Sequence, residues 1–258
     1  MVDDGSTDAL REEFEGRISE KIRFFQISNS ERGAARNFGA SKSFGKYINF
    51  FDSDDRMLPN HLSEAFRGLI GNEVPILRFD YLIISEEGEL KTCEKVKDPS
   101  STIFFDNFIS INSIFLRSDI VHDYRFCEDR KLASSEDWEL WIRLAARFPF
   151  HHIDIATSAI LVHEERSLLT IHPTRAMERD LLLIEKLSSD PIVMKAYGFG
   201  FRKFCAERYS FFMLGFSSVN FFNIFFSCSL RAVFFWPPVM LTRRFLAAMR
   251  SFLFSIGR

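Results

Sequence analysis

Lys46-Tyr-Ile-Asn-Phe-Phe-Asp-Ser-Asp-Asp55 is the stretch of this sequence that decides the fold. Residues 47–51 favour a strand and do not alternate between apolar and polar, which is typical of a strand buried on both faces in a parallel sheet. Three carboxylates, Asp52, Asp54 and Asp55, follow directly. An open α/β sheet builds its ligand site beyond the carboxyl ends of its strands, so this stretch predicts such a site.

The spacing of the carboxylates indicates what they could bind. Asp52 and Asp54 are two positions apart, so in a regular strand both side chains would leave the same face. Like charges held this close repel each other unless a cation lies between them, and Mn²⁺ or Mg²⁺ suits such a pair, with phosphate oxygens completing the coordination. Taken alone, the stretch also fits a solvated acidic turn that leads into a helix.

Strands and helices alternate around this stretch, which indicates a parallel α/β sheet. The pattern predicts strands at 1–2, 22–27 and 47–51, with helices over 6–15, 31–44 and 58–70. Beyond residue 75 the pattern changes. It predicts a hairpin over 75–95, a strand at 112–117, a helix over 135–148, strands at 151–155 and 159–163, and helices from residue 173 onward.

Composition and charge limit the class of protein. The chain has 258 residues, and its net charge of −2 gives no electrostatic reason to expect nucleic acid as a partner. The four cysteines are scattered without metal-ligand spacing, which favours a reduced, cytoplasmic protein. Residues 201–258 hold fourteen of the 31 phenylalanines, and eight Lys or Arg against the single acid Glu207.

Three motifs occur in order along the chain. They are Val2-Asp-Asp-Gly-Ser-Thr-Asp8, then Gly33-Ala-Ala-Arg-Asn37 together with the acidic stretch, and Ser135-Glu-Asp-Trp-Glu-Leu-Trp141. Over residues 2–167 they resemble the family-2 inverting glycosyltransferases.

The resemblance implies an α/β fold of the GT-A type, Rossmann-like with a mainly parallel sheet. The expected division is a GT-A domain over 1–170 and a helical, Phe-rich, basic extension over 171–258. The implied activity moves a sugar from a nucleotide-sugar, UDP-linked in our interpretation, to a saccharide or lipid-linked acceptor. Enzymes of this kind build surface polysaccharide or other glycoconjugates.

The resemblance assigns nucleotide recognition to Asp3 and Asp4, since a carboxylate accepts hydrogen bonds from a base or a ribose hydroxyl. Asp4 could also cap the following helix. Asp52 and Asp54 match the Asp-x-Asp motif that holds Mn²⁺ or Mg²⁺ on the diphosphate, and Asp52 thereby joins the nucleotide site. For Arg36 two roles are open, contact with the diphosphate or ion pairing with the carboxylates of the sheet.

Asp137 resembles the general base that deprotonates the acceptor hydroxyl, and Glu136 and Trp138 would lie on the acceptor side. The alternatives are ordinary acids in a first helical turn, which the helix dipole favours, and tryptophans that belong to the core. His163 matches a position where many family members carry a histidine near the metal and diphosphate, and a structural role is the alternative.

The chain departs from the family at its start, where the first strand and helix of the domain are missing. A longer native chain, a strand supplied by another polypeptide, or a non-catalytic nucleotide-binding remnant would each explain the departure. We interpret it as an incomplete start, and we expect weak or no activity from the chain as given.

The basic tail suggests contact with a membrane at the inner face of the plasma membrane. Residues 209–230 carry no charge, but a Gly-Phe-Ser-Ser-Val-Asn segment at 215–220 predicts a turn between two helices, 201–214 and 220–232. Arginines beside Phe and Leu in a third helix from about residue 239 suit an anionic membrane surface. The alternative is packing of residues 196–258 on the rest of the chain or on another subunit.

Overall fold

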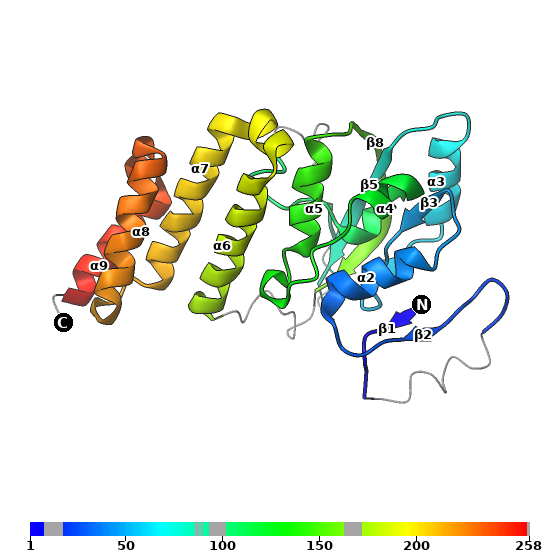
Figure 1. The fold of residues 1–258 in the computed structure, drawn as a ribbon, viewed down its shortest axis with the longest axis horizontal. Helices are drawn as coiled ribbons and strands as arrows, with labels where there is room; N and C mark the ends of the chain where they lie inside the picture. The colour runs from blue at the N-terminus through cyan, green and yellow to red at the C-terminus, as the bar shows by residue number, and fades with distance from the viewer. Residues whose placement is uncertain (8–17, 86–87, 89, 93–101, 163–171, 257–258) are drawn as a thin grey trace. The chain divides into compact units, whose positions relative to one another are not determined.

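The structure is a computed structural model, and it describes residues 1–7, 18–85, 88, 90–92, 102–162 and 172–256. The chain divides into two compact units, Met1–Leu169 and Thr170–Arg258. The first unit is α/β and the second is helical (Figure 1). Each unit is described by itself below.

A small two-stranded sheet lies at the start of the first unit. Strands β1 (Val2–Asp3) and β2 (Phe25–Gln26) pair in parallel, and helix α2 (Glu31–Ser41) packs against β1. Strand β2 and helix α2 are both shorter than the sequence predicted. Most of the predicted helix over 6–15 lies outside the described residues.

Gly33 explains why α2 can approach the loop that precedes the third motif. A Cβ atom at this position would lie 2.3 Å from the carbonyl oxygen of Cys127, so only glycine fits. Buried Asn37 strengthens the same contact, because its Nδ2 donates to the Phe126 carbonyl at 2.9 Å and its Oδ1 accepts from the Phe126 amide at 3.0 Å. The second motif therefore fixes where α2 lies.

The larger sheet has six strands in the order β3-β7-β5-β8-β4, with β6 paired to β5. Their bounds are β3 Tyr47–Asn49, β4 Arg56–Met57, β5 Ile76–Ile84, β6 Leu90–Thr92, β7 Ile114–Arg117 and β8 Phe150–Leu161. The predicted α/β fold class is confirmed, but the sheet is mixed and not mainly parallel. Within it β5 and β8 pair in parallel, whereas β7 runs antiparallel to both β3 and β5.

Two predictions from the local sequence pattern were wrong for this sheet. The alternation over residues 1–70 predicted a parallel neighbour for β3, but β3 pairs with β7, a strand of the second half of the unit. The two strands expected at 151–155 and 159–163 are one strand, β8, whose register against β5 shifts around Asp80. The predicted hairpin is confirmed, since β5 and β6 pair antiparallel.

Three helices accompany the larger sheet: α3 (His61–Leu69), α4 (Ser118–Asp123) and α5 (Glu136–Ala145). Helix α3 begins two residues after Pro59, and its Ala65 packs with Leu77, Phe79 and Phe115 of the sheet. Helix α5 buries Trp138, Trp141 and Leu144, and it ends at Ala145, three residues before the end of the predicted helix.

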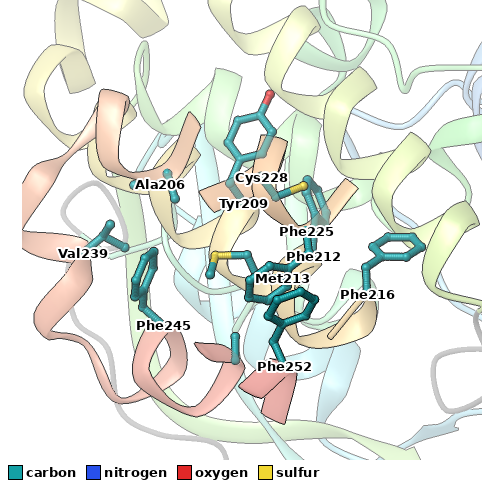
Figure 2. Close-up of a cluster of buried hydrophobic side chains, with 12 residues drawn as sticks. Ala206, Tyr209, Phe212, Met213, Phe216, Phe225, Cys228, Val239, Phe245 and Phe252 are labelled. Atoms are coloured by element: carbon teal, nitrogen blue, oxygen red, sulfur yellow. The ribbon is translucent and has the colours of Figure 1, made fainter. Parts of the chain in front are cut away.

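The second unit consists of four helices: α6 (Pro173–Ser189), α7 (Pro191–Gly215), α8 (Phe222–Phe235) and α9 (Arg243–Ile256). Helix α7 contacts the other three, and Figure 1 shows α6, α7 and α8 side by side. Figure 2 shows their shared core of aromatic and small side chains, which includes Phe212, Phe225, Phe245 and Phe252. The rings of Phe225 and Phe252 stack with centroids 4.2 Å apart.

The turn predicted at residues 215–220 is confirmed, because α7 ends at Gly215 and α8 begins at Phe222. In the part of the chain that the structure describes, no helix combines the length and the apolar character needed to cross a membrane.

Candidate functional site

Three carboxylates meet in a turn just beyond β3. One oxygen of each of Asp52, Asp54 and Asp55 lies within 4.8 Å of the others. The expected strand geometry was wrong, because β3 ends at Asn49 and Asp52 lies three residues beyond it. The turn brings the carboxylates together, and the hydrogen bond from the Asp55 amide to the Asp52 carbonyl at 3.3 Å closes it.

Asn112, a buried residue from the loop before β7, holds this turn in place. Its Nδ2 donates to Asp55 Oδ2 at 2.6 Å, and its Oδ1 accepts from the Asp52 amide at 2.9 Å. The other oxygen of Asp55 accepts from the amide of Leu161, in β8, at 3.1 Å. Both oxygens of Asp55 are therefore engaged in fixing the turn.

The donor set fits a hard divalent cation, because it consists of carboxylate oxygens gathered on one turn. Asp55 is committed to Asn112 and Leu161. With Asp55 positioning the turn, Asp52 and Asp54 would hold Mn²⁺ or Mg²⁺, which stays a prediction; both oxygens of Asp52 also accept from Arg36, at 2.9 and 3.2 Å.

Arg36 joins the acidic turn to the N-terminus of α5. Its guanidinium donates to Asp52 Oδ1 at 2.9 Å and to Glu136 Oε1 at 2.8 Å, and the side chain is only 10% exposed. Burial alone would lower the pKa of Arg36, but the charges of Asp52 and Glu136 outweigh burial and raise this pKa. Of the two roles open for Arg36, the structure shows ion pairing, with Asp52 and Glu136.

Glu136 and Asp137 occupy the first turn of α5, as the third motif predicted. Burial and the neighbouring charge of Glu136 raise the pKa of Asp137 to about 6, although Arg36 acts in the opposite direction. Asn107 Nδ2 lies 3.4 Å from both oxygens of Asp137. A carboxylate with such a pKa is suited to accept a proton near neutral pH.

Glu136 is buried, and its two oxygens differ. Oε1 accepts from Arg36, whereas Oε2 has no hydrogen-bond partner among the described residues. Buried polar atoms nearly always have a partner, so this oxygen can accept a hydrogen bond from a ligand.

Asp3 and Asp4 lie at the end of β1, and both already accept hydrogen bonds. Asp3 accepts hydrogen bonds from the Ser6 amide at 3.0 Å and from Gln26 Nε2 at 2.9 Å. Hydrogen bonding from Ser6, from its side chain above all, lowers the pKa of Asp3. Asp4 Oδ1 accepts from the amide of Ser30, the residue that caps α2, at 2.7 Å. Asp4 thus supports the start of α2, and most of the following helix, which the sequence expected Asp4 to cap, lies outside the described residues.

The two remaining site predictions have different outcomes. Trp138 is 7% exposed and its indole N–H donates to the Ile103 carbonyl at 2.6 Å, so it belongs to the core, the alternative that the sequence left open. His163 lies outside the described residues.

Two residues of the site, Asn107 and Asn112, escaped the sequence motifs. Both come from the segment between β6 and β7, more than 50 residues from Asp52 along the chain. For Asn112 the signal was its place in Ile109-Ser-Ile-Asn112-Ser-Ile114, where three isoleucines are interspersed with polar residues. Buried asparagines in such runs usually serve a hydrogen-bond network.

Comparison with known proteins shows what the chain is similar to. The family model for Glycosyl transferase family 2 matches residues 1–85, which include Asp3, Arg36 and the acidic turn. An uncharacterized glycosyltransferase of Rickettsia bellii is 31% identical over 152 residues, which are 57% of this chain and 22% of that protein. One from Methanocaldococcus jannaschii is 33% identical over 124 residues, 46% of this chain and 42% of the relative. The chain thus spans less than half the length of these relatives.

Similarity to solved structures extends over both units. The crystal structure of S. aureus TarS 1-349 in complex with UDP-GlcNAc has a TM-score of 0.68 and 18% identity, over 98% of this chain and 78% of that chain. A likeness at this identity shows the fold, which is GT-A with a helical C-terminal region. Residues 1–85 of this chain thus match the model of glycosyl transferase family 2, and the similar proteins in Rickettsia and Methanocaldococcus are glycosyltransferases by name.

Proposed function

Proceeding from this match to glycosyl transferase family 2, we propose that the chain transfers a sugar from a UDP-linked donor to a saccharide or lipid-linked acceptor, with inversion at the anomeric carbon. The observation that carries the proposal is the chain of contacts Asp52–Arg36–Glu136, which joins the acidic turn to Asp137. It brings a site suited to a diphosphate near a carboxylate suited to deprotonate a hydroxyl.

The donor side uses the first two motifs. Asp52 and Asp54 would hold a divalent cation, which would supply positive charge to the diphosphate of the donor. Asp3 and Asp4 bind the nucleoside, and their existing bonds to Ser6, Gln26 and Ser30 fix the carboxylates before it arrives. UDP is our choice because the similar TarS structure contains UDP-GlcNAc.

The acceptor side uses the third motif. The carboxylate of Asp137 takes the proton of the acceptor hydroxyl while that oxygen forms a bond to the anomeric carbon. The bond from this carbon to the diphosphate oxygen breaks, and its electron pair leaves with the nucleoside diphosphate. The unpartnered Oε2 of Glu136 accepts a hydrogen bond from a second hydroxyl of the acceptor.

Arg36 links the two halves electrostatically. Its positive charge acts on Asp52, Glu136 and Asp137, so it offsets part of the negative charge of these carboxylates. When a cation and a diphosphate occupy the turn, the guanidinium of Arg36 would remain beside Asp137 and keep the pKa of Asp137 from rising further. We therefore assign Arg36 to positioning, within the nucleotide site that the sequence predicted.

The process is synthesis of surface polysaccharide or a related glycoconjugate on the cytoplasmic side of the membrane. This proposal draws on a relative in Bacillus subtilis, the minor teichoic acid biosynthesis protein GgaA, which is 37% identical over 71 residues, 26% of this chain and 16% of that protein.

Calorimetry with UDP tests the donor site without depending on turnover. We expect UDP binding that strengthens about tenfold or more with Mn²⁺, as a metal that bridges carboxylates and diphosphate should give, and loss of that gain in Asp54→Ala. Asp123→Ala, at an exposed acid on α4, is the matched control. An equal affinity for UDP with and without Mn²⁺ would overturn the assignment of Asp52 and Asp54 as metal ligands. Metal-dependent binding without turnover of UDP-sugars would indicate a non-catalytic nucleotide-binding chain instead.

A further inference from the structure

Helix α8 exposes a stripe of large apolar side chains. Phe222, Phe226, Leu230 and Phe234 follow one another at intervals of four residues and are 50%, 53%, 57% and 74% exposed. The opposite side of α8 contributes Phe225, Cys228 and Ala232 to the core in Figure 2. The unit's own core therefore does not use the stripe, and stripes of this size on a soluble protein mark an interaction surface.

Helix α9 has the same character and adds positive charge. Its Phe245, Ala248 and Phe252 are buried, whereas Leu246, Leu253 and Phe254 are 55%, 63% and 63% exposed. Arg243, Arg244 and Arg250 are exposed on the same helix, and the Arg250 guanidinium lies 5.5 Å from the centre of the Phe254 ring.

The charge of this region selects the partner. From residue 208 to residue 258 the sequence has six arginines and no aspartate or glutamate, although the whole chain has a net charge of −2. A second copy of the same surface would bring arginines against arginines. An apolar stripe beside arginines without acids is instead complementary to an anionic lipid bilayer, where rings enter the acyl boundary and guanidinium groups meet lipid phosphates.

We propose that the outer faces of α8 and α9 dock on an anionic membrane surface. We call them the lipid-binding faces; they consist of Phe222, Phe226, Leu230 and Phe234 on α8 and of Arg243, Leu246, Arg250, Leu253 and Phe254 on α9. Both faces belong to the helical unit, so the inference stands independently of the proposed sugar transfer.

The test is flotation of the full chain with two kinds of vesicle, phosphatidylcholine alone and phosphatidylcholine mixed with phosphatidylglycerol. We expect binding to the mixed vesicles to exceed binding to the neutral ones by about tenfold, since each basic residue near an anionic surface adds to the attraction. Raising the salt concentration should reduce the difference.

Two sets of variants separate the apolar and the charged contributions. The double variant Phe226→Ser and Phe234→Ser should lower binding to the mixed vesicles about tenfold or more, because rings no longer enter the acyl region. Phe44→Ser, at an 89% exposed phenylalanine of the first unit, should leave binding unchanged. Arg243→Gln with Arg250→Gln should abolish the preference for anionic lipid, whereas Lys195→Gln on α7 should keep it.

The outcomes decide between partners. Circular dichroism melting should give the same Tm for every variant, because each replaces an exposed side chain. Equal flotation of the double variant and the native chain overturns the proposal, as does equal binding to neutral and anionic vesicles. A native chain that sediments as a dimer, and becomes monomeric in the double variant, would assign the faces to self-association and also overturn the proposal.

Discussion

Each of the two units of this chain is stabilised internally by a different kind of contact. In Met1–Leu169, polar side chains connect segments about 100 residues apart, as in the bonds from Arg36 to Glu136 and from the Leu161 amide to Asp55. In Thr170–Arg258, aromatic rings from α7, α8 and α9 fill the core. Hydrogen bonds have strict geometry and fix atoms for chemistry, whereas apolar packing stabilises with little demand on direction.

The second unit also has buried charges, but they serve the packing of its helices. Asp180 of α6 is fully buried, with Arg179 Nε at 3.1 Å and Arg208 at 3.6 Å. Burial lowers the pKa of Arg208 although Asp180 opposes the change. This cluster links α6 to α7, and its arginines already face the carboxylate, so it serves packing of the helices.

The largest expected effect tests the chemistry of the first unit. Asp137→Asn should reduce kcat about 10³-fold, because the amide cannot accept the proton and general-base catalysis is worth 10²–10⁴-fold. UDP affinity should change less than about twofold, since Asp137 lies on the acceptor side. Steady-state kinetics with a UDP-sugar and calorimetry with UDP measure the two quantities. Asp123→Asn serves as the control, and an active Asp137→Asn variant would remove the assignment of the base.

The second prediction concerns the aromatic core. Phe212→Ala should lower the free energy of unfolding of the helical unit by about 3–5 kcal/mol, the usual cost of deleting a buried ring. Phe212 is 2% exposed, whereas its neighbour Phe211 is 43% exposed, so Phe211→Ala is a matched control with an expected change below about 1 kcal/mol. Urea unfolding followed by far-UV circular dichroism measures both. Equal destabilisation by the two variants would contradict the packing described for α7.

The third prediction tests the clamp, by which we mean the two hydrogen bonds that Asn112 makes with Asp52 and Asp55. Asn112→Leu should lower the free energy of unfolding of the first unit by about 2 kcal/mol. The substitution leaves the Asp52 amide and one oxygen of Asp55 without their hydrogen-bond partner, and each buried unpaired group costs roughly 1–3 kcal/mol. It should also weaken the gain in UDP affinity from Mn²⁺. Asn220→Leu, at an exposed asparagine of the second unit, should change neither quantity. Unaltered metal dependence in Asn112→Leu would show that the turn forms without the clamp.

The smallest expected effect is a pH dependence. Only ionised Asp137 can accept a proton, so with its pKa raised to about 6 activity falls as pH drops through 6. At pH 5, one unit below that pKa, kcat/KM should be about tenfold below its plateau. Arg36 lowers the pKa of Asp137, so Arg36→Gln should move the acidic limb to higher pH, and Arg36→Lys should move it less.

The pH profile of the donor site provides the check for this prediction. UDP affinity measured at the same pH values distinguishes titration of Asp137 from loss of the folded site. An acidic limb that stays in place in Arg36→Gln would show that Arg36 does not set the pKa of Asp137.

The sequence by itself determined the local features. Apolar periodicity and turn residues located α2, α3, α5 and the turn between α7 and α8, because a helix is encoded by neighbours three and four positions apart. The three motifs predicted Asp3, the acidic stretch and Asp137 as parts of one site, and the structure connects two of these parts, the acidic turn and the first turn of α5, through Arg36. The role of each residue stays a prediction.

Only the tertiary structure decided how those parts meet. Strand β3 takes an antiparallel partner from residues 114–117, Asn112 clamps Asp52 and Asp55, and Arg36 contacts an acid 100 positions away. Contacts over such separations depend on which surfaces bury together, and no local pattern records that choice. The acidic stretch that indicated the fold is therefore a turn held by distant residues, and not the strand end that its own sequence suggested.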